Sequence, residues 1–292
     1  MPKNKLKNYF LLHWLVFIWG FTAILGALIN VDAIPLVWYR MGLAVIILFI
    51  YFLIIKKNIK VPLRALMKFL VTGIIIALHW IFFFSAIKEA NISIALVAMS
   101  TGALFTSLIE PFFFKRRLNF LEILFGLIII VGLYIIFNVE GEYALGILYA
   151  LIAAFLSAIF TVLNGLYIKQ HDAEVISFYQ LFFGVGFITL FILATSGFSV
   201  EKFSLSNSDI FYIFILSSIC TAYAFVVSVK IMKHITPYTV MLTINLEPVY
   251  GIILAVIIFG EKEKMSPQFY IGALIILITV IANGILKNKK RV

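Results

Sequence analysis

The chain has 292 residues, of which 64% are hydrophobic and 12% are charged, with a net charge of +10 and a mean hydropathy of +1.13. A water-soluble domain of this length cannot bury so much apolar surface, so the lipid bilayer is the expected solvent. The basic residues fall in short clusters between apolar runs and form no patch with interleaved readout residues, which excludes nucleic acid as a partner. The single cysteine, Cys220, lies inside an apolar run and excludes a disulfide framework.

Ten apolar segments are each long enough for a transmembrane helix, which needs about 20 residues. The first segment follows three lysines, as in a signal peptide, but it is longer than a signal-peptide core and lacks a clean cleavage site, so we expect a retained helix. Apolar residues cover every face of these segments without alternation, which argues against membrane strands and against helices exposed to water. The predicted spans are 10–29, 35–55, 67–87, 93–114, 119–138, 145–168, 175–195, 208–233, 238–259 and 267–286.

Lysine and arginine are distributed unequally between alternate loops, and this bias predicts the orientation. With the amino terminus inside, 18 of the 23 basic residues lie in cytoplasmic segments, four lie outside and Arg40 lies within a span. We therefore expect both termini in the cytoplasm and the protein in the cytoplasmic (inner) cell membrane. The predicted cytoplasmic loops are 56–66, 115–118, 169–174 and 234–237. The four outer residues are Lys88, Lys202, Lys262 and Lys264.

A weak internal repeat relates the two halves of the chain. An offset of 145 residues places Ala86-Ile87-Lys88 over Ile231-Met232-Lys233, and an offset of 140 places Val37-Trp38-Tyr39-Arg40 over Ser177-Phe178-Tyr179-Gln180. Because each half has five spans, an odd number, the second half must enter the membrane from the opposite face. The sequence thus predicts an all-α membrane protein of ten transmembrane helices in two inverted repeats, 1–140 and 141–292, which together form one transmembrane domain. Transporters of this architecture bind substrate between the repeats near the midplane.

Several short motifs resemble those of the drug/metabolite transporter superfamily, and more narrowly its ten-helix EamA-type branch. They are Ile18-Trp19-Gly20-Phe21, Tyr39-Arg40, Leu246-Glu247-Pro248-Val249 and Phe259-Gly260-Glu261-Lys262, and the likeness extends over residues 10–287. The resemblance implies export or exchange of small metabolites through a central cavity, with helices 5 and 10 peripheral. The first half departs from the second: Lys115-Arg116 replaces Gly260-Glu261, and Gly102-Ala103 replaces Glu247-Pro248. We therefore expect the halves to be chemically unequal at mid-depth.

Glu247 is the first candidate for substrate binding or coupling. It lies about nine residues into the ninth span, near the bilayer centre at 1.5 Å per residue. An ionised carboxylate there costs several kcal/mol unless it faces a polar cavity or a partner. Pro248 has no N–H and leaves the carbonyl of Ile244 free, and Asn245 adds a polar side chain. The alternative is a protonated carboxyl that only bonds another helix.

His79 and Trp80 lie near mid-depth in the third span. Histidine titrates near neutral pH, so His79 is a candidate for relaying a proton or binding a carboxylate or an aromatic solute. The alternative is a neutral imidazole bonded to a neighbouring backbone or hydroxyl group. Tyr223 stands near the repeat-related position in the eighth span and is expected to face the same space.

Arg40 lies nearer the outer end of the second span, where its planar fork suits a carboxylate or phosphate. The competing interpretation makes Trp38 and Tyr39 an interfacial aromatic belt with Arg40 reaching towards headgroups. Asn164 and Gln180 near the inner face are possible counterparts of the Arg40 region. The hydroxyl residues Ser100 and Thr101, which precede Gly102 in the fourth span, complete the candidate substrate or coupling set.

Enzyme signatures are missing from the sequence: it has no phosphate-binding Gly-Lys loop, no His-Glu-x-x-His helix and no Gly-x-Ser-x-Gly elbow. We therefore expect no catalytic activity, no cofactor and no metal site. The leading hypothesis is a secondary transporter of small organic metabolites, with amino acids among the candidates, acting as an exporter by alternating access. A channel or scaffold is an alternative, as is an intramembrane enzyme. The sequence leaves open whether protons are the coupling ion and whether the protein forms a homo-oligomer.

Overall fold

A computed structural model of the chain describes residues 3–115, 120–195 and 197–289, and this part is helical, with no strand within it. Arg116 and Arg117 of the predicted cytoplasmic loop lie outside the described residues, as do Lys290 and Arg291 at the carboxyl terminus.

The helices follow the order expected for two halves of five spans. The first half contains α1 (Lys3–Leu28), α2 (Ala33–Ile55), α3 (Leu63–Glu89), α4 (Ile92–Met99), α5 (Gly102–Phe114) and α6 (Phe120–Val139). The second half contains the 3₁₀ turn η1 (Gly141–Tyr143), α7 (Ala144–Tyr167), α8 (Ala173–Thr195), α9 (Val200–Phe203), α10 (Asn207–Ser217), the π-helical η2 (Ser218–Tyr223), α11 (Ala224–Ile231), α12 (Pro237–Ile244), α13 (Glu247–Phe259), η3 (Gly260–Glu263) and α14 (Pro267–Lys289).

Ten helical segments correspond one to one with the predicted spans. Eight of them are long and apolar enough to cross a membrane, and two shorter apolar stretches, Leu124–Asn138 and Pro267–Thr279, mark the fifth and tenth. These two lie inside α6 and α14, helices of 20 and 23 residues, and 20 residues rise about 30 Å, the thickness of the hydrocarbon core. The predicted fold class is confirmed: the protein is a multi-pass, all-α membrane protein.

The fourth and ninth spans are interrupted at repeat-related positions, since Ser100 and Asn245 are 145 residues apart. At each interruption the backbone bonds tighten from i−4 to i−3, as in Thr101 N to Ala98 O (3.2 Å) and Leu246 N to Thr243 O (3.0 Å). The local causes differ. In the first half the Thr101 hydroxyl donates back to Ala98 O at 2.7 Å, whereas in the second Pro248 lacks the N–H that would continue the ladder.

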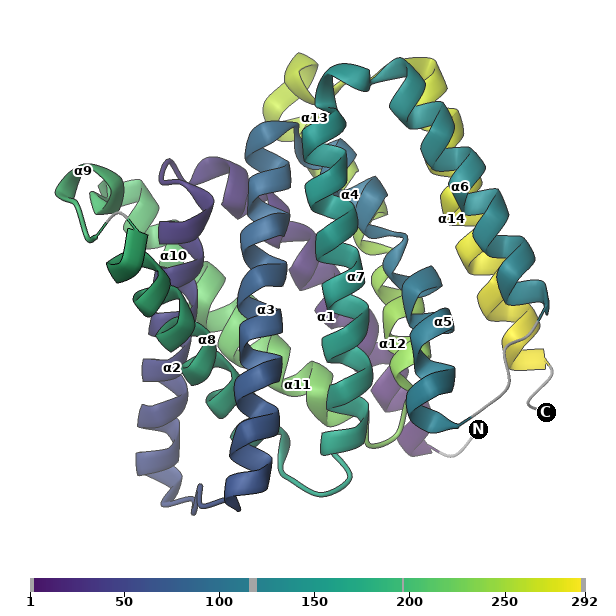
Figure 1. The fold of residues 1–292 in the computed structure, drawn as a ribbon. Helices are drawn as coiled ribbons and strands as arrows, with labels where there is room; N and C mark the ends of the chain where they lie inside the picture. The colour runs from purple at the N-terminus through teal and green to yellow at the C-terminus, as the bar shows by residue number, and fades with distance from the viewer. Residues whose placement is uncertain (1–2, 116–119, 196, 290–292) are drawn as a thin grey trace.

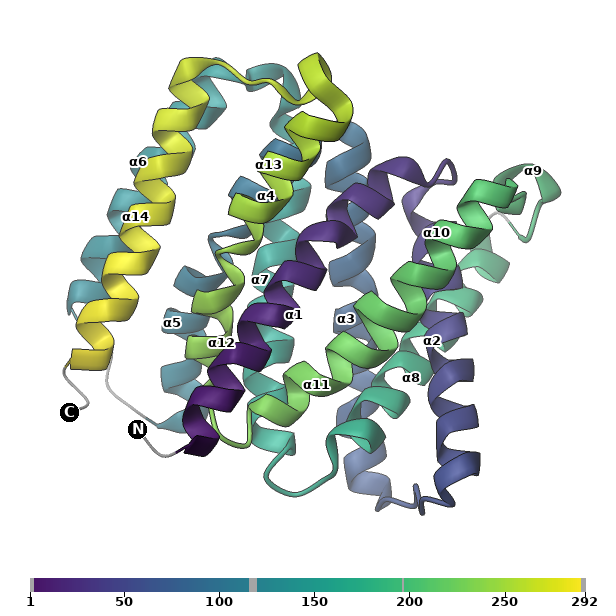
Figure 2. The same cartoon turned by 180° about the vertical axis from the view of Figure 1, so that it is seen from behind.

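Helices α6 and α14 lie side by side at one edge of the bundle, away from the other helices, in both views (Figures 1 and 2). Their antiparallel contact depends on two glycines. A Cβ at Gly132 would lie 2.7 Å from Ile276 Cγ1, and a Cβ at Gly272 would lie 2.7 Å from Ile136 Cγ1. The two spans that the family resemblance makes peripheral are thus packed mainly on each other.

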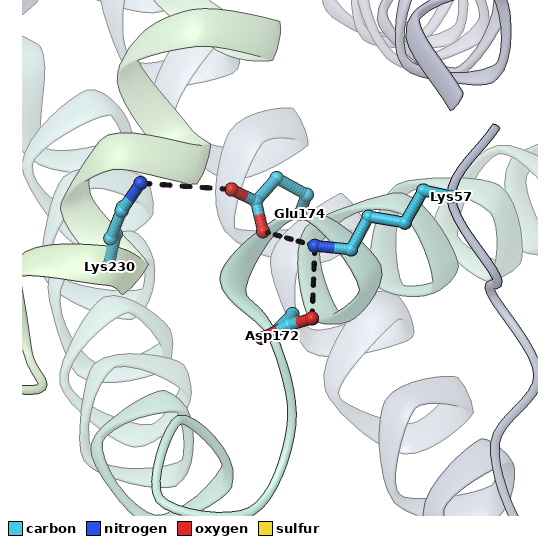
Figure 3. A network of polar contacts seen from close by, with 4 residues as sticks. All are labelled: Lys57, Asp172, Glu174 and Lys230. Carbon is cyan, nitrogen blue, oxygen red and sulfur yellow. Dashed lines mark hydrogen bonds and ion pairs between the residues drawn. The ribbon is translucent and has the colours of Figure 1, made fainter. Parts of the chain in front are cut away.

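The described ends of the first and last helices lie at the same end of the bundle as three of the predicted cytoplasmic loops (Figure 1). Figure 1 shows the described ends of α1 and α14 at the lower end, together with the α2–α3, α7–α8 and α11–α12 connections. Ion pairs link three of these elements there (Figure 3): Lys57 Nζ lies 2.9 Å from Asp172 and 3.3 Å from Glu174, which lies 3.9 Å from Lys230. The first span of the second half, α7, thus starts at the opposite end of the bundle from α1, as the odd number of spans in each half predicts (Figure 1).

Candidate functional site

A cavity of about 80 Å³ lies in the middle of the bundle, enclosed by spans from both halves. It has room for roughly five water molecules, or for part of a small solute. Its walls come from α1, α2, α3, α4, α7, η2, α11, α12 and α13, whereas α6, α8 and α14 contribute none of its lining residues. Four of the sequence-predicted site residues line it: Arg40, His79, Trp80 and Glu247.

The π-helical turn η2 shapes the wall next to α2. An extra residue in this turn lets the Thr221 hydroxyl donate to Leu216 O, five residues back, at 2.7 Å. The carbonyl of Cys220 then accepts a hydrogen bond from Trp19 Nε1 at 3.2 Å, and Thr221 Oγ1 accepts one from Arg40 Nε at 2.6 Å. Insertions of this kind are frequent at functional sites because they free backbone groups and redirect side chains.

Arg40 lies inside the bundle, with only 1% of the residue exposed, so its side chain does not reach towards lipid headgroups. Its guanidinium carbon lies 4.0 Å from the centre of the Trp80 ring and 5.5 Å from that of Phe84. Stacking on aromatic faces and the bond to Thr221 hold the guanidinium plane in place. Its Nη1 atom is buried without a hydrogen-bond partner, so the site offers a charged donor to an anionic group.

Glu247 is the first residue of α13, immediately after the interruption of the ninth span. A close crossing of α1 and α13 one turn further on positions it, since a Cβ at Gly20 would lie 3.1 Å from Tyr250 Cβ and 3.6 Å from the backbone N of Gly251. Glu247 and Arg40 both line the cavity. No ion pair within 4.0 Å joins these two described residues, so a carboxyl group and a guanidinium group line the same space without direct contact.

His79 lines the cavity and is fixed by a backbone contact at the same time. Its Nδ1 lies 2.8 Å from the carbonyl oxygen of Ala153, and because a carbonyl only accepts, Nδ1 carries the proton in this contact. The ring lies between Phe83 and Phe160 at centroid distances of 6.3 and 5.2 Å. This contact is the one expected if His79 is a neutral imidazole bonded to a neighbouring backbone group. It leaves Nε2 as the nitrogen available to a ligand.

Four other sequence-predicted residues do not line this cavity. Tyr223 is 44% exposed, because the extra residue of η2 turns it away and brings Phe225 to the wall instead. Thr101 and Asn245 are buried at the two helix interruptions, where Asn245 Nδ2 has no partner. Ser100 lines a separate apolar pocket between α4, α13 and α14.

A polar face on α7 includes Asn164, which the sequence suggested as a counterpart of the Arg40 region, and two residues that it did not single out, Ser157 and Thr161. Ser157, Thr161 and Asn164 line the cavity at spacings of four and three residues, which places them on one side of a helix. Small residues dominate the apolar α7, so no charge marked this face, but the i, i+4, i+7 pattern of polar residues was a usable signal. Thr22 and Trp19 on α1 were also missed as lining residues.

Repeat symmetry relates several lining residues to one another. Trp80 and Phe225 are 145 residues apart, as are Met99 and Ile244, and all four line the cavity. In the same alignment of the two halves, Glu247 corresponds to Gly102 at the offset of 145, and Gln180 corresponds to Arg40 at the offset of 140. The cavity therefore lies between the repeats, and its two chemically distinct walls match the unequal halves expected from the sequence.

The cavity extends towards the end of the bundle that holds the chain ends. Asn164 lies in the last turn of α7, Met232 directly follows α11 and Val240 lies in the first half of α12. The opposite end is crossed by hydrogen bonds between elements. Glu263 accepts from the backbone N–H groups of Ile92 and Ser93, both at 3.0 Å.

Two further bonds close that end near α1. Asp209 Oδ1 accepts from the backbone N–H of Asn30 at 2.9 Å, and Lys88 Nζ donates to Ile29 O at 2.9 Å. The loop after α1 is thereby joined to both α10 and α3. Hydrogen bonds thus join elements at the end away from the cavity, and the ion pairs of Lys57 and Lys230 join elements at the other end.

Relatives of the chain are named as transporters. It is 25% identical over 206 residues to an uncharacterized transporter of Clostridium kluyveri, in an alignment that covers 68% of this chain and 65% of the relative. The alignment thus spans just under two thirds of that relative's length. It is 23% identical to the uncharacterized transporter YxxF of Bacillus subtilis, with 72% and 67% covered. For an uncharacterized transporter of Archaeoglobus fulgidus the identity is 22%, with 68% of each chain covered.

A solved crystal structure has the same fold. It superposes with a TM-score of 0.70 over 96% of this chain and 98% of that chain, at 18% identity. The model of the EamA-like transporter family matches the sequence twice, over residues 6–138 and 144–284, one match in each half. Because the family model matches both halves of the chain, the chain belongs to the EamA-like transporter family.

Proposed function

We propose that this protein is a secondary transporter that exports small zwitterionic metabolites, with amino acids as the first candidates, by alternating access around the central cavity. The single observation that carries the proposal is the presence of Arg40 and Glu247 in one cavity. Arg40 offers a buried guanidinium nitrogen without a partner, and Glu247 offers a carboxylate on the facing wall.

These two groups suit the two ends of a zwitterion. A guanidinium binds a carboxylate through charge-assisted hydrogen bonds, and a carboxylate within the membrane is stabilised by an ammonium group. Trp80, Phe83 and Phe160 supply apolar walls for the remainder of the solute. Substrate binding at mid-depth between inverted repeats is the arrangement that rocking of one repeat against the other requires.

The direction and orientation belong to the same proposal. We place both termini, and the end of the bundle towards which the cavity extends, on the cytoplasmic side, because 18 of the 23 basic residues fall in the segments assigned to that side. A site loaded from the cytoplasm fits an exporter. The division into halves at residues 140 and 141 is supported by the two family-model matches on either side of it.

Counterflow in proteoliposomes tests the proposal. Vesicles that contain purified protein are loaded with unlabelled amino acids one at a time, and uptake of the radiolabelled form is measured with and without a pH gradient. We expect saturable exchange of at least one amino acid, and a net flux that depends on the gradient if protons are coupled.

The alternatives give different results in the same vesicles. A channel would equilibrate the label without acceleration by internal solute, and an intramembrane enzyme would change the chemical identity of the recovered label. Absence of exchange for every zwitterion, with exchange of a purely anionic or cationic metabolite, would contradict the pairing of Arg40 with Glu247.

A further inference from the structure

The polar face of α7 runs along the cavity towards the end of the bundle where α7 ends. Ser157, Thr161 and Asn164 are all buried, Asn164 completely, and all three line the cavity. No ionisable group occurs on this face. The wall is therefore chemically distinct from the part that holds Arg40 and Glu247, because it offers only neutral hydrogen-bonding groups.

These side chains have hydrogen-bonding capacity that the protein uses poorly. The hydroxyls of Ser157 and Thr161 both approach the sulfur of Met241, at 3.9 and 3.5 Å, and a thioether is a weak acceptor. Asn164 Nδ2 is buried without a partner. An unpaired buried amide is unfavourable relative to a paired one, so its position beside a cavity points to a partner that arrives with the solute.

Gln180 holds the Asn164 amide in position. Its Nε2 donates to Asn164 Oδ1 at 2.6 Å. Helix α8 can approach α3 this closely because residue 73 is a glycine: a Cβ at Gly73 would lie only 2.3 Å from the Gln180 carbonyl oxygen. Exchanging N and O in both amides preserves the mutual bond and still leaves one N–H group and one carbonyl oxygen unpaired. Gln180 is thus a positioning residue behind the cavity wall.

Gln180, which holds Asn164, corresponds in the repeat to Arg40. Arg40 and Gln180 stand 140 residues apart on the second helix of each half, and each donates a 2.6 Å hydrogen bond to a side chain of another helix. In one half this position supplies a cation that lines the cavity, and in the other it orients the neutral Asn164 amide that lines it. A neutral amide is suited to a group that carries no charge.

We propose that the α7 polar face is a subsite for an uncharged hydrogen-bonding group of the transported solute, a hydroxyl or a carboxamide, with Asn164 as its main hydrogen-bonding residue. The subsite rests on the proposed function, since Arg40 and Glu247 orient the solute so that its side chain extends along α7. Solutes with such a group form bonds that their apolar isosteres cannot form, and the difference appears as selectivity.

Two pairs of near-isosteric amino acids test this subsite: L-threonine with L-valine, and L-asparagine with L-leucine. Competition of each against exchange of a labelled substrate in proteoliposomes gives a selectivity ratio for each pair. We expect wild-type protein to favour threonine and asparagine by about tenfold, the effect of one well-formed buried hydrogen bond.

Variants that remove the polar groups without changing shape should abolish that preference. Thr161→Val alters one hydroxyl, and the double change Asn164→Leu with Gln180→Leu replaces both amides, so that neither is left buried alone. The ratios should fall towards one while exchange of valine and leucine persists. Thr279→Val makes the same chemical change in α14, outside the cavity, and should leave both ratios as in wild type.

Each remaining outcome contradicts a different part of the proposal. Wild-type ratios near one, or ratios that survive in the double variant, would mean that the amides serve only to hold buried water, and the subsite alone would fail. The transport proposal fails together with the subsite if none of the four amino acids is exchanged or inhibits exchange of the labelled substrate, and none raises the melting temperature of the purified protein.

Discussion

At the scale of single residues, burial separates Arg40 from the other basic side chains. Most lysines and arginines lie at the ends of the spans, whereas Arg40 is enclosed by Thr221, Trp80 and Phe84. A buried cation without a bound anion is costly, and the opposing Glu247 offsets only part of that cost because no direct ion pair forms. The two residues are consequently the most informative positions to change.

Glu247→Gln keeps the shape of the side chain and removes its charge. We expect transport to fall by about 10- to 100-fold, the range for loss of a hydrogen bond to a charged group, while folding survives. Glu247→Asp should retain partial activity, because the charge stays and the reach shortens by one methylene. Counterflow and net uphill flux are measured in vesicles of matched protein content.

The two assays assign the role of Glu247. Loss of uphill flux with intact counterflow would indicate proton coupling, and loss of both would indicate a substrate ligand. Wild-type rates in both assays would show that Glu247 is only a structural carboxyl, and the site as proposed would be wrong.

At the scale of helices, the α6–α14 pair and the interrupted spans have opposite properties. The glycine contact between α6 and α14 is close and apolar, which favours a rigid pair. The interruptions at Ser100 and Asn245 leave short half-helices next to the cavity. Changes in the pair should thus affect stability, and changes around the cavity should affect transport.

Gly132→Val tests the rigid pair. The new Cβ would meet Ile276 Cγ1 at 2.7 Å and the Gly272 carbonyl oxygen at 3.0 Å, so the helices must separate, at a cost of about 1–3 kcal/mol. A lower melting temperature in detergent is the expected result. Gly141→Ala is the control, because no atom lies within 4 Å of a Cβ there; equal melting temperatures for the two variants would contradict the packing.

Thr279→Ala tests whether α14 takes part in solute contact. Its hydroxyl donates to Ile275 O of its own helix at 2.6 Å, and α14 provides no lining residue of the cavity. Transport should remain near the wild-type rate, with unchanged selectivity among competing solutes. A shift in selectivity would place α14 in the solute path and overturn this layout.

The ion pairs between the α2–α3 and α7–α8 connections predict a small pH effect. The hydrogen bond from Lys57 lowers the pKa of Asp172, so its contribution to stability is present above the unfolded value of about 3.9 and is lost as pH falls through the folded pKa. Because the Asp172 side chain is 55% exposed, the contribution is about 0.5 kcal/mol or less.

Asp172→Asn should therefore melt slightly below wild type at pH 7, and the gap should shrink progressively as the pH falls below about 3.9 and through the lowered folded pKa. Thermal unfolding in detergent at low salt measures the difference. Glu201→Gln, a change of another exposed carboxylate, should give no such pH-dependent gap, and a gap for Asp172→Asn that does not shrink on acidification would rule out this ion pair as its source.

At the scale of the whole molecule, the arrangement of the ends predicts sidedness. Lys60 and Glu142 are both exposed, and the α2–α3 and α6–α7 connections that carry them lie at opposite ends of the bundle (Figure 1). In a Cys220→Ser background, Glu142→Cys should react with an impermeant thiol reagent in intact cells. Lys60→Cys should react only after permeabilisation. The reverse pattern would invert the proposed orientation, and labelling of both from outside would contradict the inverted repeat.

The sequence by itself determined the number, order and limits of the spans, because apolar length and charged loops are local properties of the chain. It also determined the family and placed Glu247, His79 and Arg40 within the membrane. Only the tertiary structure decided which way these side chains face. The π-helical turn redirects Tyr223, and the bond of Arg40 to Thr221 spans 181 residues of sequence.

The polar face of α7 likewise depends partly on the sequence and partly on the tertiary structure. Its spacing is legible in the sequence, but whether Asn164 faces lipid, another helix or a cavity depends on how α3, α8 and α12 pack around it. Packing of this kind is set by contacts between distant segments, such as the close approach of Gly73 to Gln180. A single sequence carries the residues for these contacts and not their pairing, and for that reason the cavity and its subsite emerged only in three dimensions.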